Sequence, residues 1–359
     1  MRFKLVLVLL LASITLVWGQ SLEERLQDLS ADAAKAYVGP IVSGFGSNLN
    51  GGWFHSAPRK TFLGVDISLG AVVMGTFFAD ENESFSTEGN FRFTRDQAMF
   101  LTQDFEDYDE MRQELIDAII SEDFYVGIFG PTIIGDPDNN LMIHFYEKTF
   151  DDIINPDTGE PVTVPGTDVE LPFGGLMDSP PIFPLVVPQL SVGTVYGTRA
   201  VFRYVPPITL KGEDDDLGEF SYLGFGLQHN LNRWLPLPLP VDFAASFFTQ
   251  TMKLEPVAEA TATTLGLNAS KRFGFRALNV TPYAGLMIES FNMDISYDYM
   301  IDEPGSEEEI PLEVAFSMKG DNKARMVVGS SFRVGLFNFN IDYNIGKYNS
   351  LTTGITLAF

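Results

Sequence analysis

Apolar and polar residues alternate along the C-terminal stretch 337–359. Between Phe337 and Ile345 the odd positions are apolar and the even positions are Asn or Asp, and the alternation resumes from Leu351 to Phe359 after a short turn. Successive side chains of a strand point to opposite faces. The pattern therefore predicts two strands, each with one apolar face and one small or polar face.

The same period recurs along most of the chain. In the first such stretch, Leu63, Ile67 and Val73 alternate with positions such as Asp66 and Gly70. Strands of about ten residues, apolar outside and polar inside, are typical of transmembrane barrels. We predict an all-β fold, an antiparallel transmembrane β-barrel of about ten strands. The expected strands are 61–75, 187–196, 198–206, 218–229, 240–253, 258–273, 279–300, 311–334, 337–346 and 350–359.

Two stretches depart from simple alternation. Apolar residues are even-numbered up to Ile288 and odd-numbered from Phe291, which predicts a β-bulge near Glu289 and Ser290. By contrast, one apolar phase continues across Lys319–Lys323. We therefore expect 311–334 to form one long strand that projects beyond the bilayer.

The segment before the first strand has two parts. Arg2 and Lys4 precede a short apolar run, so 1–19 reads as a signal peptide that is removed on export. Residues 20–60 begin with an amphipathic helix, which Gly39-Pro40 should end, and continue with a glycine-rich stretch. This part is either a plug inside the barrel, a periplasmic cap, or a plain lead-in to the first strand.

The barrel itself is expected over 61–359, with an ordered insertion at 79–186. The insertion contains a short amphipathic helix near Met111–Ile119, a strand near 141–147 and proline-rich segments. It could be an extracellular loop, a plug in the lumen, or extra strands that raise the count to 12 or 14. If the last strand ends in the periplasm, the turns at 335–337 and 273–278 and the N-terminus are also periplasmic.

The inward-facing charges are the main candidates for function. With apolar residues outward, both acidic and basic side chains point into the lumen. They either pair with one another and fill a narrow barrel, or line a path and bias its selectivity. The lumen-lining candidates are Asp66, Arg199, Arg203, Asp242, Arg325, Arg333 and Asp342. The expected interfacial anchors are the aromatic residues Trp234, Tyr297, Tyr299 and Phe359.

Net charge and composition limit the possible partners. The formal charge is −25, and acidic runs at 104–110, 212–219 and 302–309 fall in expected loops. Such a chain is a poor nucleic-acid binder. The runs are solvated loop tips or, alternatively, divalent-cation sites at the cell surface. The chain has no cysteine, so it relies on neither disulfides nor thiol chemistry.

No motif for catalysis or metal binding stands out. The three histidines are far apart in sequence, and neither HExxH, GxSxG nor a phosphate-binding loop is present. We expect no cofactor, no metal centre and no enzymatic activity. An active site of the membrane-phospholipase kind, with His144 or His229 as base, is the alternative.

The order of segments resembles a family of uncharacterised outer-membrane barrel proteins known mainly from Bacteroidota and their relatives. The resemblance rests on YVGPIVSGFGSNLNGGWF, PQLSVGTVYGTRAVFRYVPP, GEFSYLGFGLQHNLNRWLP, VTPYAGLMIES and VGLFNFNIDYNIGKYNSLTTGITLAF. It covers most of the chain except 79–186 and implies location in the outer membrane of a Gram-negative cell. The glycine-rich segment is also similar to that of fatty-acid-transporter barrels, which implies uptake of hydrophobic solutes.

Two functions of different kinds follow. One is a passive channel or transporter for small, hydrophobic or other solutes. The other is a closed barrel that acts as a surface scaffold, with acidic loops or the insertion engaging partners or cations. In both, the lipid bilayer is a partner, and the barrel-assembly machinery would act on the C-terminal strand that ends at Phe359.

Overall fold

The computed structural model describes residues 20–59, 63–102, 105, 108–171, 174–175, 183–211, 216–234, 239–302 and 309–359. The signal peptide expected at 1–19 lies outside them. The chain divides into two compact units. The insertion unit comprises 1–40 and 79–179, and the barrel unit comprises 41–78 and 180–359.

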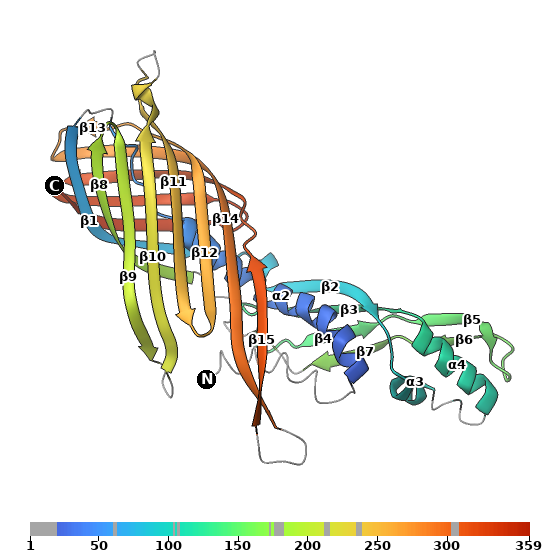
Figure 1. The fold of residues 1–359 in the computed structure, drawn as a ribbon. Helices are drawn as coiled ribbons and strands as arrows, with labels where there is room; N and C mark the ends of the chain where they lie inside the picture. Colours follow the sequence, from blue (N-terminus) through green and yellow to red (C-terminus); the bar gives the residue numbers. More distant parts are fainter. Residues whose placement is uncertain are drawn as a thin grey trace. The chain divides into compact units, whose positions relative to one another are not determined.

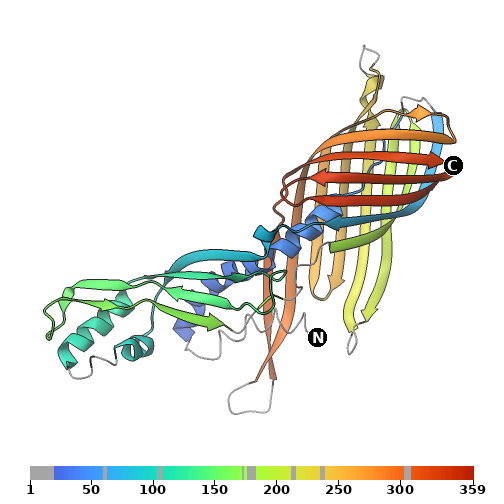
Figure 2. The ribbon, with the colours of Figure 1, turned by 180° about the vertical axis from the view of Figure 1, so that it is seen from behind.

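Ten antiparallel strands form a closed barrel (Figures 1 and 2). Each barrel strand pairs with the next one along the chain, and the pairing of the first strand, β1, with the last, β18, closes the cylinder. The predicted fold class is confirmed. The barrel strands are β1 (Leu63–Thr76), β8 (Phe183–Val195), β9 (Thr198–Lys211), β10 (Asp216–Asn230), β11 (Asp242–Glu255), β12 (Ala258–Ser270), β14 (Leu278–Asp302), β16 (Ala324–Val334), β17 (Phe337–Ile345) and β18 (Ser350–Ala358).

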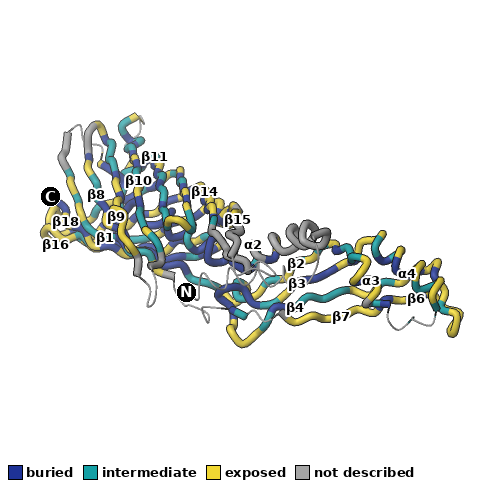
Figure 3. Tube along the Cα trace, turned by 60° about the horizontal axis from the view of Figure 1, so that its bottom comes forward, coloured by how far each residue is buried: buried dark blue, intermediate teal, exposed yellow. Residues whose placement is uncertain are grey.

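The barrel wall alternates between exposed apolar and buried residues (Figure 3). Leu286 and Ile288 of β14 are about two-thirds exposed, at 67% and 70%, whereas Tyr283 and Met287 are buried. Because these residues share one strand, the exposed set faces outward and the buried set faces the lumen.

The two ends of the barrel differ in their connections. At one end lie short turns such as Tyr196-Gly197 between β8 and β9, where both residues have positive φ (52° and 75°), as a type I′ hairpin turn requires. At the other end β1 finishes and β8 starts, so the long 79–179 segment leaves and returns there. We call these the short-turn end and the long-loop end.

The predicted bulge near Glu289 and Ser290 is wrong. β14 pairs with β12 in one unbroken register from Tyr283–Ser270 to Ile295–Ala258. The apolar phase shifts because Phe291, Met293 and Ile295 are buried on the lumen side, whereas Ile288 faces outward. Apolar residues here change face without an extra residue in the strand.

The prediction of one strand over 311–334 is also wrong, although both parts do pair with β14. β15 (Glu309–Lys319) pairs with the distal half of β14, and β16 pairs with the proximal half. Gly320–Lys323 interrupts them and changes the phase, so that Met318 is buried and Met326 is exposed. A continuous sequence period therefore concealed a change of face.

Helix α2 (Gln20–Asn50) continues through Pro40 instead of ending there. A proline within a helix removes one backbone hydrogen bond and usually kinks or ends it. Beyond Pro40 the helix lies in the barrel unit, where the hydroxyl of Thr76 donates to the carbonyl of Gly44 at 3.0 Å. Tertiary contacts of this kind override the local stop signal. In the described part of the chain, no helix is long and apolar enough to cross a membrane.

The insertion unit has its own sheets and helices. β2 (Ser84–Phe91), β3 (Phe124–Pro131), β4 (Leu141–Phe145) and β7 (Thr167–Leu171) form one sheet, and β5 (Lys148–Ile154) and β6 (Pro161–Val164) form another. The helical elements are η1 (Asp80–Asn82), α3 (Arg95–Leu101) and α4 (Asp109–Ser121). The predicted amphipathic helix is α4, which buries Leu115, Ile116 and Ile119. None of these strands joins the barrel sheet, so the insertion does not raise the count to 12 or 14.

The acidic runs fall largely outside the described residues. Of their described residues, Asp109 and Glu110 form the first turn of α4 and Asp216–Glu219 start β10, instead of lying in loops. Acidic side chains in the first turn of a helix interact favourably with its dipole.

Candidate functional site: the occupied lumen

The lumen of the barrel contains the chain's own segment Ile41–Arg59, which we call the lumen segment. Near its start Gly44 contacts Thr76 at the end of β1, and near its finish the carbonyl of Pro58 accepts a 2.5 Å hydrogen bond from Asn230 at the end of β10. Between them, the hydroxyl of Thr264 donates to the Asn50 amide oxygen at 2.5 Å. The segment therefore runs through the lumen from the long-loop end to the short-turn end.

This path corrects the predicted position of the N-terminal segment. β1 does begin at the short-turn end, as the strand parity predicts. However, the chain reaches that end from inside the barrel, so Ile41 lies at the opposite, long-loop end. Of the three alternatives for 20–60, these contacts support the plug, and only for the second half of the segment.

Two arginines from the barrel wall bind the C-terminal end of helix α2. Arg203 on β9 donates to the carbonyl of Gly51 at 3.0 Å, and Arg325 on β16 donates to the carbonyls of Asn50 and Ser47. The last turn of α2 contains no basic residue of its own. Its unpaired carbonyls carry the negative end of the helix dipole, which cations stabilise.

These arginines approach from opposite walls. Around the barrel, β8, β1, β18 and β17 separate β9 from β16 on one side, and β10, β11, β12 and β14 separate them on the other. The end of the helix is thus held from both sides of the lumen.

Arg203 is fully buried (0% exposed) and has further partners. Its Nε donates to Gln189 Oε1 at 2.8 Å, and its guanidinium lies 4.1 Å from the centre of the Trp53 ring. Trp53 in turn stacks on Phe248, with ring centroids 5.0 Å apart. Cation–π and stacking contacts thus connect Arg203 on β9 to Phe248 on β11 through Trp53 of the lumen segment.

Arg325 also forms a buried ion pair. Its guanidinium nitrogen lies 3.5 Å from Glu289 Oε2, and the two side chains are only 2% and 0% exposed. The pair satisfies two charges that would otherwise be buried alone.

A second group of contacts lies towards the short-turn end. Arg199 donates to the carbonyl and hydroxyl oxygens of Ser56 at 3.1 and 3.2 Å, and its guanidinium lies 3.7 Å from Asp66 Oδ2. Asp242 accepts a 3.1 Å hydrogen bond from Asn230, the same side chain that holds Pro58.

Asp342 and Arg333 contact the wall itself. Asp342 is buried and accepts 2.8 Å hydrogen bonds from Tyr283 and Asn344. Arg333, at the short-turn end, donates to the backbone carbonyls of Gly335 and Ala358 at 3.1 and 2.7 Å.

The anchor candidates occupy different environments. Trp234 is 72% exposed and follows the short 3-10 helix η3 (Leu231–Arg233). Phe359 is also exposed. Tyr297 and Tyr299 lie on the distal part of β14, opposite Val314 and Leu312, and their side chains lie outside the described residues.

The two histidine candidates for a catalytic base lie in different units of the chain. Both ring nitrogens of His229 are engaged, because Nε2 accepts from Trp234 at 2.6 Å and Nδ1 contacts Thr198 Oγ1 at 2.9 Å. His144 lies on β4 of the insertion unit rather than in the barrel wall. Among the described side chains, no three His, Asp or Glu residues are grouped to hold a metal ion.

Several contributors to the lumen were not selected from the sequence. The sequence indicates a bulge at Glu289 and shows Trp53 only as one aromatic residue in a glycine-rich stretch. Gln189 and Gln250 hold Arg203 and the Leu49 carbonyl, respectively. Their inward parity could have identified the glutamines, but no local pattern indicated that they face a helix end.

A family described as of unknown function, DUF6588, matches residues 1–359. The chain belongs to this family. The match confirms that the chain is a member of an uncharacterised family, and the expected occurrence of DUF6588 members in Bacteroidota stays a prediction. No curated protein matches the sequence.

Solved outer-membrane barrels show weak structural likeness to this DUF6588 member. The N-terminal β-barrel domain of Pseudomonas aeruginosa OprF is 16% identical over 39% of this chain and 87% of its own, with a TM-score of 0.19. Neisserial surface protein A is 12% identical over 45% of this chain and 92% of its own, with a TM-score of 0.21. Vibrio cholerae OmpT is 8% identical over 82% of this chain and 99% of its own, with a TM-score of 0.25. At these TM-scores the likenesses carry no argument about function, and the barrel assignment rests on the strand pairing.

Proposed function

We propose that this protein is exported by its signal peptide and resides in an outer membrane, with the outward apolar face in contact with lipid. Exposed side chains on separate strands support this, including Leu223, Leu286 and Ile288. A water-soluble protein rarely exposes a contiguous apolar belt of this kind, whereas a membrane barrel requires one. Cell fractionation tests the location, and recovery in the soluble periplasmic fraction would contradict it.

Within that membrane, the function supported best is a closed, non-conducting barrel that anchors the insertion unit. The observation that carries this proposal is the fixation of the end of α2 by Arg203 and Arg325 from opposite walls. A segment with contacts along the whole lumen occludes a passage through a barrel of this size.

Planar-bilayer recording tests the closure. We expect the purified protein to show no steady conductance, because the lumen segment fills the path. Steady porin-like currents from the unmodified protein would refute the proposal. The variant Arg203→Ala/Arg325→Ala should show frequent openings, because the end of α2 loses its cations. Arg333→Ala is the control, since Arg333 bonds only wall carbonyls among its described contacts.

An engineered disulfide separates displacement of the segment from general loosening of the barrel. The side-chain oxygens of Asn48 and Thr76 lie 2.8 Å apart, and the chain has no native cysteine. Adding Asn48→Cys/Thr76→Cys to the arginine variant should abolish the openings when oxidised and restore them on reduction. Each variant is first checked for the compact electrophoretic mobility of a folded barrel.

A second candidate, passive passage of small solutes, is favoured by the polar inner face of β17 and β18. Asn340, Asp342 and Asn344 of β17 and Thr352 and Thr356 of β18 are buried on the lumen side. If the lumen segment moved, this face would line a hydrophilic route. Liposome swelling with sugars of graded size distinguishes the candidates, since a closed barrel gives no swelling.

Assembly by the barrel-assembly machinery would act on β18. In the folded barrel the backbone N–H of Phe359 donates to the carbonyl of Ile67 at 2.8 Å, so the last residue contributes to the β18–β1 seam. We expect Phe359→Ala to slow the appearance of folded protein in the outer membrane. An unchanged rate would remove this role.

A further inference from the structure

One face of the β2–β3–β4–β7 sheet in the insertion unit exposes aromatic rings. The opposite face is a core, where Val126 and Ile128 of β3 pack with Ala33 and Phe91. The alternate residues Tyr125 and Phe129 are 47% and 40% exposed, and Tyr146, just after β4, is 39% exposed. Large exposed rings that gather on one sheet face indicate an interaction surface.

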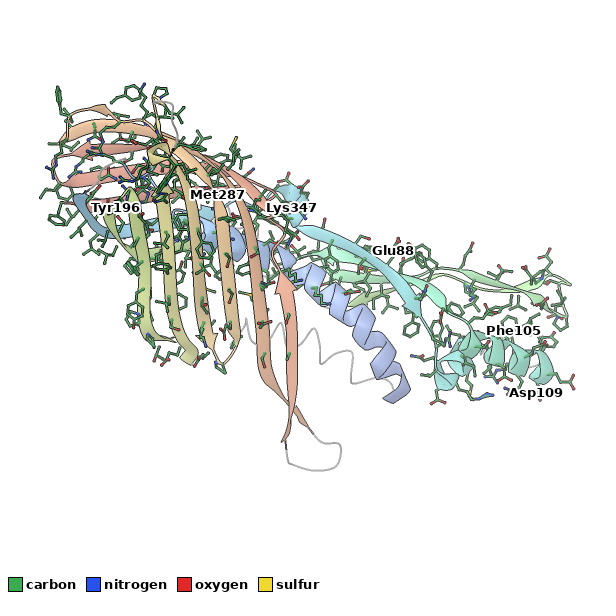
Figure 4. The ribbon with its side chains drawn as sticks, turned by 45° about the horizontal axis from the view of Figure 1, so that its top comes forward. Glu88, Phe105, Asp109, Tyr196, Met287 and Lys347 are labelled. Atoms are coloured by element: carbon green, nitrogen blue, oxygen red, sulfur yellow. The ribbon has the colours of Figure 1, made fainter. Side chains whose placement is uncertain are left out.

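A row of paired residues crosses this face. Glu88 on β2 is opposite Gly127 on β3, Gly127 is opposite His144 on β4, and His144 is opposite Asp168 on β7. Glu88 is labelled in Figure 4. Gly127 has no side chain, and a Cβ there would lie 3.5 Å from the Tyr146 hydroxyl. The Tyr146 side chain therefore lies over the glycine, and the row ends in a carboxylate on each side, Glu88 on β2 and Asp168 on β7.

Hydrogen bonds and ring contacts hold these groups in place. Tyr125 and Tyr146 both donate to Glu88, the latter at 3.5 Å, and His144 Nδ1 lies 2.5 Å from Asp168 Oδ1. The Tyr146 ring is 5.1 Å from that of Tyr125 and 4.4 Å from that of His144. The hydrogen bond to Glu88 raises the pKa of Tyr125, so its phenol remains a neutral donor.

This combination of rings and carboxylates suits a cation. Ring faces attract ammonium and guanidinium groups, and the flanking carboxylates add charge complementarity. Glu170 on β7 extends the acidic margin and accepts a 2.6 Å hydrogen bond from Asn140. A phosphate-bearing lipid headgroup would meet like charge at both ends of the row, whereas a basic peptide would meet opposite charge there.

We propose that this face binds a lysine or arginine side chain presented by a basic segment of a partner protein. The side chain lies against the Tyr146 ring, and its charge faces the row that ends in Glu88 and Asp168. The inference does not depend on whether the barrel conducts, so failure of either proposal leaves the other standing.

Fluorescence anisotropy tests the proposal with the full-length protein in detergent and a labelled peptide of lysines spaced by glycine and serine. We expect saturable binding that the peptide with acetylated lysines does not show. Glu88→Gln/Asp168→Asn should weaken binding by about tenfold. Asp151→Asn/Asp152→Asn, an equal charge change on exposed β5 residues of the same unit, should change it by less than about twofold.

Tyr146 variants separate the ring from its hydroxyl. Tyr146→Phe keeps the ring and should retain binding, whereas Tyr146→Ala should lose most of it. Equal losses from the two double variants would overturn the proposal, because only general acidity would be at work. Binding of the acetylated peptide, no binding by the unmodified protein, or a preference for phosphatidylethanolamine vesicles would overturn it as well.

Discussion

At the scale of single residues, buried charge in the barrel is used to hold a helix end. Arg203 and Arg325 would each be costly to bury alone. Both are instead paired with carbonyls at the C-terminus of α2, and Arg325 also with Glu289. The same groups that a wider barrel would use for ion selectivity here fix the chain in its own lumen.

The Arg325–Glu289 pair gives the first stability prediction. Arg325→Leu should destabilise the folded barrel by about 3–5 kcal/mol, because Glu289 is left buried without its partner. Adding Glu289→Gln should recover part of that loss by removing the unpaired charge. Denaturant unfolding of refolded protein in detergent measures both. Equal stability of the single and double variants would show that the pair is not coupled.

Tyr37 gives a prediction about pH. Its hydroxyl donates to the Gly174 carbonyl at 2.9 Å, and burial raises its pKa to about 12. The neutral phenol is therefore favoured in the folded state. The resulting stability is complete below the unfolded pKa of about 10 and is lost as the pH rises through about 12.

Hydrogen exchange of the insertion unit at increasing alkaline pH measures this loss, after correction for the intrinsic exchange rate. The decline should be smaller in Tyr37→Phe, which should also be less stable by about 1 kcal/mol at neutral pH because one hydrogen bond is missing. An identical alkaline decline in both proteins would exclude Tyr37 as the cause.

At the scale of elements, two glycines of helix α2 differ in what surrounds them. A Cβ at Gly46 would lie 2.8 Å from the Phe291 ring, whereas a Cβ at Gly39 would meet nothing within 4 Å apart from its chain neighbours. We expect Gly46→Ala to destabilise the barrel by about 1–3 kcal/mol through overpacking. Gly39→Ala should change stability much less, because the helical gain of about 0.5–1 kcal/mol is offset by crowding of the new Cβ against the ring of Pro40. Thermal unfolding of the two variants provides the comparison, and equal shifts would contradict the packing argument.

The sequence predicted the strands better than it predicted the faces of their side chains. Period-two alternation identified the barrel strands because most outward positions are apolar. The alternation indicates the wrong face at Phe291 and Met318, where apolar residues are buried on the lumen side. An alternation pattern shows that two faces differ, but it cannot tell a face that meets lipid from one that meets an internal segment.

The candidate residues show the same limit: alternation indicates which side chains point inward, but not what they contact. Inward parity selects Arg199, Arg203 and Arg325 as inner-wall candidates, since that choice depends only on strand register. Their partners Ser56, Gly51 and Asn50 are on the lumen segment. Contacts between segments so far apart in sequence have no local signature, and the proline at position 40 indicated that the helix ended before reaching them.

At the scale of the whole molecule, the path of the chain constrains assembly. The lumen segment precedes β1 in the sequence, yet the barrel closes only when the last strand, β18, pairs with β1. A barrel of this size is too narrow for a folded helix to be threaded after closure. We therefore expect the strands to close around the lumen segment.

The same path predicts an orientation that can be measured. Outer-membrane barrels have short periplasmic turns and longer extracellular loops, which puts the long-loop end outside the cell. A membrane-impermeant maleimide should then label Asp151→Cys, in the insertion unit, on intact cells. Leu336→Cys, in the exposed turn between β16 and β17, should be labelled only after lysis. Because the chain has no native cysteine, the unmodified protein is the background control. The reverse pattern would put the long-loop end in the periplasm, and the cationic partner proposed for the insertion unit would then have to be a periplasmic protein.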